Sequence, residues 1–386
     1  MSEFEVLIDF GSKNLRLGVF DNKSECIYSS KINIEKNSEI RSSENSLKDL
    51  VRDAEKQLTT HLDNVSILYD SSKFYSVDLS IKKIFDQPTF VAEHYNNLID
   101  EANFIISENN FKDQVIHIII NNIIIDNNKK LEAIANNVKT KSLILDLKFI
   151  CLNKSLIYEI SSMFKKNNLN ISNIYCTSYV KTIFYKKVLQ IKNNFIFLDI
   201  GYERTSALIF KNNKFEFFNS INIGGNNITK DISKILNLNI EFSENLKRKY
   251  NKNENEISFD KKDLNDINLY SEISKKKISL GLLKQVIEAR IDEIIELSIN
   301  KNNYFKNIDT SDKPCIIFIG DGSKLISNNY NLKTKNNFSE FIYFDENESK
   351  ICKAGFSYKH TDESQLTLEK KRSKKVGFFE GFFNFF

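Results

Sequence analysis

Ile8-Asp-Phe-Gly-Ser-Lys13 and Phe197-Leu-Asp-Ile-Gly201 are the two stretches that decide the expected fold of this chain. In each, an apolar strand ends in an aspartate and a glycine that begin a turn. Further strands and a helix follow both turns, near 15–20, 26–34 and 46–62 in the first copy and near 206–210, 214–222 and from 226 in the second. Because this pattern recurs while the residues differ, the sequence predicts two related α/β lobes.

Two more glycine turns follow the same logic, namely Gly224-Gly225 and Gly320-Asp-Gly-Ser323, the latter directly after the apolar strand 314–319. Glycine lets the backbone come close to a phosphate, and turn amides form an anion-binding concavity. A carboxylate at a strand end can hold Mg²⁺ directly or through water. Any one such turn is a weak signal, because an ordinary hairpin turn explains it better, but all of them in this order favour phosphate and metal chemistry.

Composition excludes several classes of protein. The chain has 386 residues, with 55 Lys and Arg against 51 Asp and Glu, and 55 − 51 = +4 argues against a nucleic-acid-binding surface. The five cysteines show no CxxC pair and the four histidines no HExxH motif, so single buried or surface residues explain them. No apolar run approaches the ~20 residues that span a bilayer. The acidic start runs straight into a strand, so we expect a cytoplasmic protein.

Three segments complete the expected organisation. Residues 81–153 form a small α+β insert, with a helix over 90–107 and strands over 114–121, 122–126 and 140–152. Residues 231–279 are polar, with helices over 243–251 and 262–270. A long helix over 279–300 carries apolar residues around a wide arc, as expected for a helix buried in a core.

The C-terminal tail gives a separate signal. Five basic residues between Lys370 and Lys375 precede a stretch with six phenylalanines. At helical spacing the six rings fall within an arc of roughly 160°. Such a segment fits a helix lying in the lipid headgroup plane, with Lys374, Lys375, Phe378, Phe379, Phe382, Phe383, Phe385 and Phe386 as the membrane-binding residues. The alternative is that the tail packs in the protein's own core or in a partner's groove.

The order of these motifs resembles the actin-like ATPase superfamily and, within it, the FtsA family of bacterial cell division proteins. The motifs are Ile8–Lys13, Phe197–Gly201, Ile223–Asp231, Ser243–Lys249, Val286–Arg290 and Ile317–Gly322. The resemblance covers nearly the whole chain. It implies an α/β, actin-like (ribonuclease H-like) two-lobed fold with a small α+β insert in the first lobe. The implied parts are a first lobe (1–80 and 154–193), the insert (81–153), a second lobe (194–230 and 280–360), its subdomain (231–279), a linker (361–375) and a terminal helix (376–386).

The resemblance also implies ATP and Mg²⁺ as cofactors. The implied nucleotide contacts are Asp9, Gly11, Ser12 and Lys13 in the first phosphate loop, Asp199, Gly201, Arg204 and Thr205 in the second, Gly224 and Gly225 in the connecting turn, Glu244 and Lys247 beside the ribose, and Gly320, Asp321, Gly322 and Ser323 in the adenosine turn. The implied metal-binding carboxylates are Asp9 and Asp199. No catalytic residue follows from the resemblance.

The second phosphate loop departs from the family pattern, which is a run of glycines followed by Thr and Asp. Here it reads Gly201-Tyr-Glu-Arg-Thr-Ser206, and Asp321 stands where glycine is typical of the adenosine turn. Glu203 would repel a polyphosphate unless it is paired, for which Arg204 is the neighbouring candidate. The departures favour at most a weak ATPase. In the alternative, Tyr202 and Glu203 point away and only the backbone matters.

The implied function is a tether in cell division. The tail would bind anionic lipids on the cytoplasmic face of the inner membrane at the division site. The polar region 231–277 would receive the C-terminal peptide of FtsZ, the tubulin-like division protein, and the body would self-assemble. Two alternatives stay open: another actin-like scaffold for cell shape or pilus assembly, and, less favoured, a kinase of the same superfamily, which would leave the tail unexplained.

Overall fold

The computed structural model of the chain describes residues 4–34, 40–126, 128–131, 137–191, 194–249, 280–300, 313–325 and 338–361. Two compact units emerge from it. The first comprises Met1–Gln190 and Glu348–Phe386, and the second comprises Ile191–Asn347. The expected helix over 262–270 and the tail expected to bind the membrane lie outside the described residues. In the described part of the chain, no helix is long and apolar enough to cross a membrane.

The first unit is built on a five-stranded sheet in the order β3-β2-β1-β4-β9. Its strands are β1 (Phe4–Phe10), β2 (Asn14–Asp21), β3 (Cys26–Asn33), β4 (Asn64–Tyr69) and β9 (Asn170–Cys176). The β1–β2–β3 meander is antiparallel, whereas β4 runs parallel to both β1 and β9. The carboxyl ends of β1, β4 and β9 therefore meet at one edge of this sheet.

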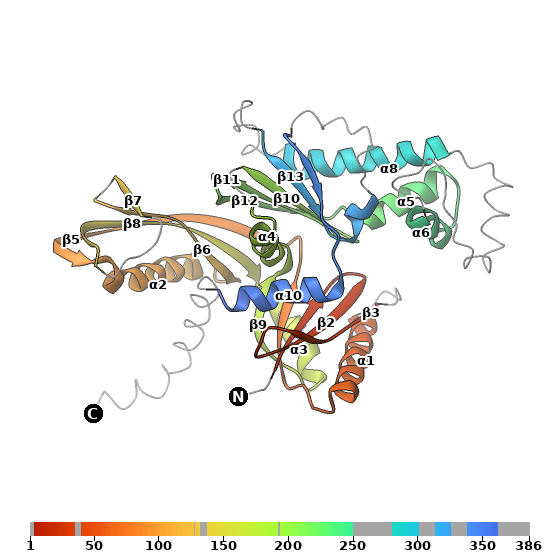
Figure 1. Ribbon diagram of the computed structural model, residues 1–386, viewed down its shortest axis with the longest axis horizontal. Helices are drawn as coiled ribbons and strands as arrows, with labels where there is room; N and C mark the ends of the chain where they lie inside the picture. Colours follow the sequence, from red (N-terminus) through yellow and green to blue (C-terminus); the bar gives the residue numbers. More distant parts are fainter. Residues whose placement is uncertain are drawn as a thin grey trace. The chain divides into compact units, whose positions relative to one another are not determined.

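Helices cover both faces of this sheet (Figure 1). One face packs on α1 (Ile40–Leu58) and α3 (Lys154–Lys166) through a core that includes Leu47, Leu50, Ile160 and Phe164. Leu7 and Phe20 on the other face pack with Cys352 and Phe356 of α10 (Glu348–Lys359), which also contacts α4 (Thr177–Val188). The division expected from the sequence placed residues 280–360 in the second lobe, and α10 differs because its apolar face is buried on β1 and β2.

The expected insert forms a second, four-stranded sheet in the first unit, in the order β5-β8-β6-β7. Its strands are β5 (Tyr75–Phe90), β8 (Lys139–Asn153), β6 (Asp113–Ile125) and β7 (Lys129–Leu131). One face packs on α2 (Val91–Asn109), as Figure 1 shows. The two strands expected over 114–126 form one continuous strand with irregularities in its pairing. The sixteen-residue β5, which begins before residue 81, is a strand that the sequence analysis missed.

The second unit repeats the first sheet. Its order is β12-β11-β10-β13-β14, with β10 (Phe195–Ile200), β11 (Thr205–Lys211), β12 (Lys214–Ile221), β13 (Cys315–Ile319) and β14 (Phe341–Tyr343). Again three antiparallel strands are followed by two parallel ones. Both sheets therefore share one strand order and one set of directions, which confirms the predicted duplication and the expected two-lobed α/β fold.

Helices gather on one face of this second sheet (Figure 1). They are α5 (Gly225–Ile235), α6 (Ile240–Lys249) and α8 (Leu280–Ile295), which ends in a π-helical turn, η2 (Glu296–Asn300). Ile196, Leu198 and Ile200 of β10 alternate toward this helical core, whose members also include Ile232, Leu246 and Ile287. A short 3-10 helix, η3 (Asp321–Leu325), follows β13. The glycine turns expected to bind phosphate thus flank buried strands and helix starts.

Candidate functional site

The first phosphate-loop candidate is a tight turn between β1 and β2. Asp9 is buried at the end of β1, and its carboxylate accepts a hydrogen bond of 2.7 Å from Arg16 Nη1 on β2. Gly11 N donates to the carbonyl of Asn14 at 3.1 Å, which closes the turn. Ser12 and Lys13 lie in this turn, and the Lys13 carbonyl accepts from Ile34 N. The guanidinium of Arg16 neutralises the carboxylate that the sequence offered as a metal ligand.

A thiol lies close to this ion pair. Cys352 of α10 is fully buried, and its sulfur contacts the Leu7 carbonyl on β1. Burial raises the pKa of the Cys352 thiol well above its ordinary value, and the negative charge of Asp9 adds to that rise. This thiol is therefore held neutral and packs as a small apolar group.

The second phosphate-loop candidate joins β10 and β11 in the second unit. Gly201 N donates to the Arg204 carbonyl at 2.8 Å, and the Thr205 hydroxyl donates to the Ile223 carbonyl at 2.7 Å. Asp199 is buried one residue before the end of β10. The turn is compact because its own backbone closes it, and Thr205 attaches it to the segment that leads to α5.

The Gly224-Gly225 turn packs directly on this loop. Gly225 N donates to the Gly201 carbonyl at 2.9 Å and Asn226 N to the Tyr202 carbonyl at 2.7 Å. A Cβ atom on Gly224 would lie 2.7 Å from the Gly201 oxygen and 2.8 Å from Arg204 N. Only glycine therefore permits this approach, and the first amides of α5 are satisfied by loop carbonyls.

The adenosine-turn candidate, residues 320–323, packs on the same loop. Gly320 has φ +87°, and a Cβ atom on Gly322 would lie 2.5 Å from Ile200 Cγ2 and 3.0 Å from the Gly201 oxygen. Gly320 N donates to the buried carboxylate of Glu346 at 2.7 Å. The Ser323 hydroxyl donates to the Gly320 carbonyl, and Asp321 pairs with Lys324 at 3.0 Å. These bonds fix the turn from inside the unit.

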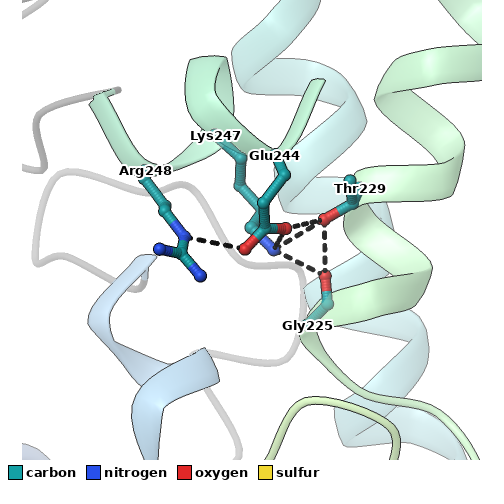
Figure 2. Close-up of polar contacts among 5 residues, drawn as sticks. All are labelled: Gly225, Thr229, Glu244, Lys247 and Arg248. Carbon is teal, nitrogen blue, oxygen red and sulfur yellow. Dashed lines mark hydrogen bonds and ion pairs between the residues drawn. The ribbon is translucent and has the colours of Figure 1, made fainter. Parts of the chain in front are cut away.

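Figure 2 shows the polar cluster formed by the two residues expected beside the ribose, Glu244 and Lys247 of α6. Lys247 Nζ donates to the Gly225 carbonyl at 2.9 Å, to Thr229 Oγ1 at 2.6 Å and to Glu244 Oε2 at 2.6 Å. Glu244 Oε1 accepts from Arg248 Nε at 2.8 Å. The Tyr202 ring centre lies 6.0 Å from Lys247 Nζ. The cluster therefore ties α6 to the start of α5 and to the second loop.

The structure brings the candidates of the second unit together: Gly201, Gly224, Gly225, Gly322 and Lys247 converge around one loop. Asp9, Gly11, Ser12 and Lys13 belong to the first unit and form a turn of their own. The residues expected to bind the membrane lie outside the described part of the chain.

Sequence reasoning missed three polar residues at these turns, namely Arg16, Thr229 and Glu346. Arg16 is seven residues from Asp9 and opposite it across a hairpin, a spacing that could have suggested the pair. Glu346 follows a long segment after β13, and no local pattern connects it to Gly320.

The fit of these residues to a magnesium nucleotide can be tested from their contacts. No group of three or more His, Cys, Asp or Glu residues suited to a metal occurs among the described residues. Asp9 is paired with Arg16, and the Lys247 ammonium is bonded to three oxygens of the second unit. Glu203 is exposed on the second loop and brings a carboxylate to it. These residues do not fit a polyphosphate with its metal as they stand.

Three comparisons relate the chain to known proteins. The model of the family "Cell division protein FtsA" matches residues 196–342. A cell division protein FtsA of Streptococcus pneumoniae is 27% identical over 99 residues, which cover 26% of this chain and 21% of that relative. The chain thus matches about a fifth of the length of this curated relative, and the match falls well short of the whole protein.

Two solved structures are similar to the chain at low sequence identity. The PilM-PilN type IV pilus biogenesis complex is 13% identical with a TM-score of 0.55, covering 94% of this chain and 93% of that one. MreB5 of Spiroplasma citri, solved bound to ADP, is 10% identical with a TM-score of 0.45 and covers 95% and 99%. The repeated sheet topology and the likeness to the pilus biogenesis structure show that the chain has an actin-like fold, and residues 196–342 are similar to the FtsA family of cell division proteins.

Proposed function

We propose that this protein tethers filaments of FtsZ to the inner face of the cytoplasmic membrane during cell division. The single observation that carries the proposal is the match of residues 196–342 to the FtsA family. That range includes the second sheet and the helices α5, α6 and α8. The phenylalanine-rich tail, which no kinase of this superfamily would need, supports the same function.

The tail supplies the membrane attachment in this proposal. Burying one phenylalanine stabilises the bound state by roughly 1.5–3 kcal/mol before the helix is ordered. Each basic residue near an anionic surface adds about 1 kcal/mol. One tail therefore gives reversible binding, and self-assembly of the actin-like body would strengthen it because several tails then act together.

Vesicle co-sedimentation tests the membrane step. The full chain should pellet with vesicles that contain anionic lipid, and a chain lacking residues 370–386 should stay in the supernatant. A Phe382→Asp variant should lower partitioning at least tenfold, since 1.4 kcal/mol corresponds to a factor of ten. The matched control is Asn384→Asp, which adds the same charge on the polar face of the expected helix. If the full and the truncated chains pelleted equally, the proposal that the tail attaches the protein to the membrane would be wrong.

A binding assay with the C-terminal peptide of FtsZ tests the partner. The full chain should bind the immobilised peptide and should recruit FtsZ filaments to anionic vesicles. The full chain is used because it contains both the segment proposed to bind the peptide, 231–277, and the tail proposed to bind the membrane. Peptide binding without recruitment would contradict the tether and leave an FtsZ-binding protein of another kind.

The structural likeness to a pilus biogenesis protein keeps one alternative scaffold in view. That likeness, at 13% identity, concerns the fold. The same peptide assay separates the two: a pilus or cell-shape scaffold would leave the FtsZ peptide unbound while still associating with the membrane. The FtsA family match favours the division protein.

A further inference from the structure

The Lys247 ammonium is the centre of a brace inside the second unit. The residue is 5% exposed, and its Nζ donates to the Gly225 carbonyl, Thr229 Oγ1 and Glu244 Oε2 at 2.6–2.9 Å. An ammonium carries three N–H donors. All three are therefore directed at oxygens of α5 and α6, as Figure 2 shows.

The carboxylate of Glu244 is engaged on both oxygens. Oε1 accepts from Arg248 Nε, and Oε2 accepts from Lys247 and from the Thr229 hydroxyl. The Glu244 side chain is 16% exposed and that of Lys247 is 7% exposed, so water screens this ion pair little. Rearranging either group would leave a charge without its compensating bonds in a dry environment.

The loop and the helix start complete the brace. The carbonyls of Gly201 and Tyr202 accept from the first amides of α5, which in a helix N-terminus are the groups suited to an anion. The Gly225 carbonyl, beside those amides, accepts from Lys247. The loop, α5 and α6 are thus joined without any group from outside the chain.

We propose that this brace of Glu244, Lys247, Thr229 and the Gly201–Tyr202 carbonyls takes the place of bound nucleotide, so that the second unit is held in its native form without ATP or Mg²⁺. The actin-like fold implies a nucleotide, and the two residues expected beside its ribose are already bonded to each other and to α5. The proposal concerns the fold of one unit and does not depend on the tether or on FtsZ.

Two physical consequences distinguish a brace from a binding site. A residue of a brace stabilises the protein in the absence of ligand, whereas a ligand-contacting residue chiefly affects the stabilisation that the ligand adds. A nucleotide at about 100 times its Kd would raise the Tm by about 5–10 °C. The brace predicts no such rise, because binding would have to break the buried bonds that already satisfy Lys247 and Glu244.

The first measurement is thermal unfolding and calorimetry of the full chain. Mg-ATP and Mg-ADP, each at millimolar concentration, should leave the Tm unchanged and give no binding heat. Lys247→Met should lower the Tm of the nucleotide-free protein by about 3–8 °C, because it removes a buried donor of three bonds. Lys234→Met, on an exposed position of α5, is the matched control and should leave the Tm unchanged.

A gentler pair of variants covers the case in which Lys247→Met does not fold. Thr229→Val keeps the shape but deletes the hydroxyl between Lys247 and Glu244, and it should lower the Tm by about 2–5 °C. Thr229→Ser keeps the hydroxyl and should restore most of the Tm. A rise of several degrees with Mg-ATP in the wild-type chain would overturn the proposal. So would Thr229→Val and Lys247→Met proteins that melt like wild type without nucleotide.

Discussion

The two strand-end aspartates lie at equivalent places in the two sheets and face different neighbours. Asp9 on β1 is opposite Arg16 on β2, whereas Asp199 on β10 is opposite Ser206 on β11. In the first unit a cation therefore neutralises the carboxylate directly across the hairpin. The shared strand order fixes where the aspartates lie, but the residue on the adjacent strand decides their charge environment.

The turns that follow these aspartates differ as well. The first turn, at Gly11, is closed by one backbone bond to Asn14. The second turn, at Gly201, is also covered by Gly224 and Gly322, whose α-carbons leave no room for a side chain. The second turn is thus packed against more backbone than the first.

The largest expected effect comes from removing the cation of the first unit. Arg16→Met leaves Asp9 as a buried carboxylate without its ion-pair partner, and the side chains are 11% and 6% exposed. Breaking a buried pair in this way costs about 3–5 kcal/mol of unfolding free energy. Urea unfolding followed by circular dichroism would measure the loss.

The double variant Asp9→Asn with Arg16→Met serves as its control. With the charge on both sides removed, most of the lost stability should return, because the penalty comes from the unpaired charge. If the single and double variants were equally unstable, the loss would come from packing by Arg16. The claim that Arg16 stabilises the first unit by neutralising Asp9 would then be wrong.

The pair of Asp9 and Arg16 also shows what the sequence could predict. The apolar runs fixed both strands, and a turn centred between Ser12 and Lys13 would have placed the two residues opposite each other. The neighbours of Gly201, by contrast, come from Gly224 and Gly322, far along the chain. Their glycines were visible in the sequence, but their convergence depends on tertiary packing.

A glycine-to-alanine pair sharpens the contrast between the turns. An added Cβ on Gly224 would lie 2.7–2.8 Å from three backbone atoms of the second loop. On Gly11 it would meet a single atom at such range, the Asn14 oxygen at 2.9 Å. Gly224→Ala should cost about 1–3 kcal/mol, the range for overpacking, and Gly11→Ala clearly less.

Chemical denaturation of both variants would measure this difference. Gly225→Ala provides a matched comparison in the same turn, since its nearest atom would be 3.6 Å away and its conformation is helical. It should stay close to wild type. An equal loss for Gly224→Ala and Gly11→Ala would mean that the second turn is no more tightly packed than the first.

The next largest effect is the dependence of stability on pH that the buried thiols cause. Burial raises the pKa of Cys315, at the start of β13, to about 11, and Glu340 adds to the rise. The pKa of the fully buried Cys352 in the first unit is raised well above its ordinary value of 9.0. A raised pKa in the folded state means that stability is full below pH 9 and falls as the pH rises toward the folded value.

Above pH 9, one fully buried thiol should therefore lower the unfolding free energy by up to about 1.4 kcal/mol per pH unit. Urea unfolding at pH 8, 9 and 10 would show this slope in the wild-type chain. Cys352→Ala and Cys315→Ala should each flatten it, because the folded pKa of each thiol lies above this pH range. If the slope were unchanged in Cys352→Ala, other titratable groups would cause the pH dependence.

Two larger features, the strand β5 and the position of α10, were not predicted from the sequence. β5 alternates apolar and polar residues from Tyr75 onward, and this period-2 signal was available although it went unused. The position of α10 was not available, because Cys352 and Phe356 meet Leu7 and Phe20 across more than three hundred residues. In the candidate site, Glu244 and Lys247 were implied by the resemblance to the FtsA family, but Thr229 was not, since only the packing of α5 on α6 brings it there.

The smallest expected effect concerns the ion pairs beside the adenosine-turn candidate. Lys324 Nζ lies 3.0 Å from Asp321 and 3.5 Å from Asp345, and the Lys324 side chain is 45% exposed. Exposed pairs contribute about 0–1 kcal/mol, and salt screens them. Lys324→Met should therefore change the unfolding free energy by less than about 1 kcal/mol at low salt and by less still in about 1 M NaCl.

Urea unfolding of Lys324→Met and of Arg16→Met at both salt concentrations compares the contributions of the two ion pairs to stability directly. The two pairs differ in burial: the Asp9 pair is shielded from water and salt, so the stability lost in Arg16→Met should persist at high salt. If Lys324→Met lost as much stability as Arg16→Met, exposure would not decide the strength of these ion pairs.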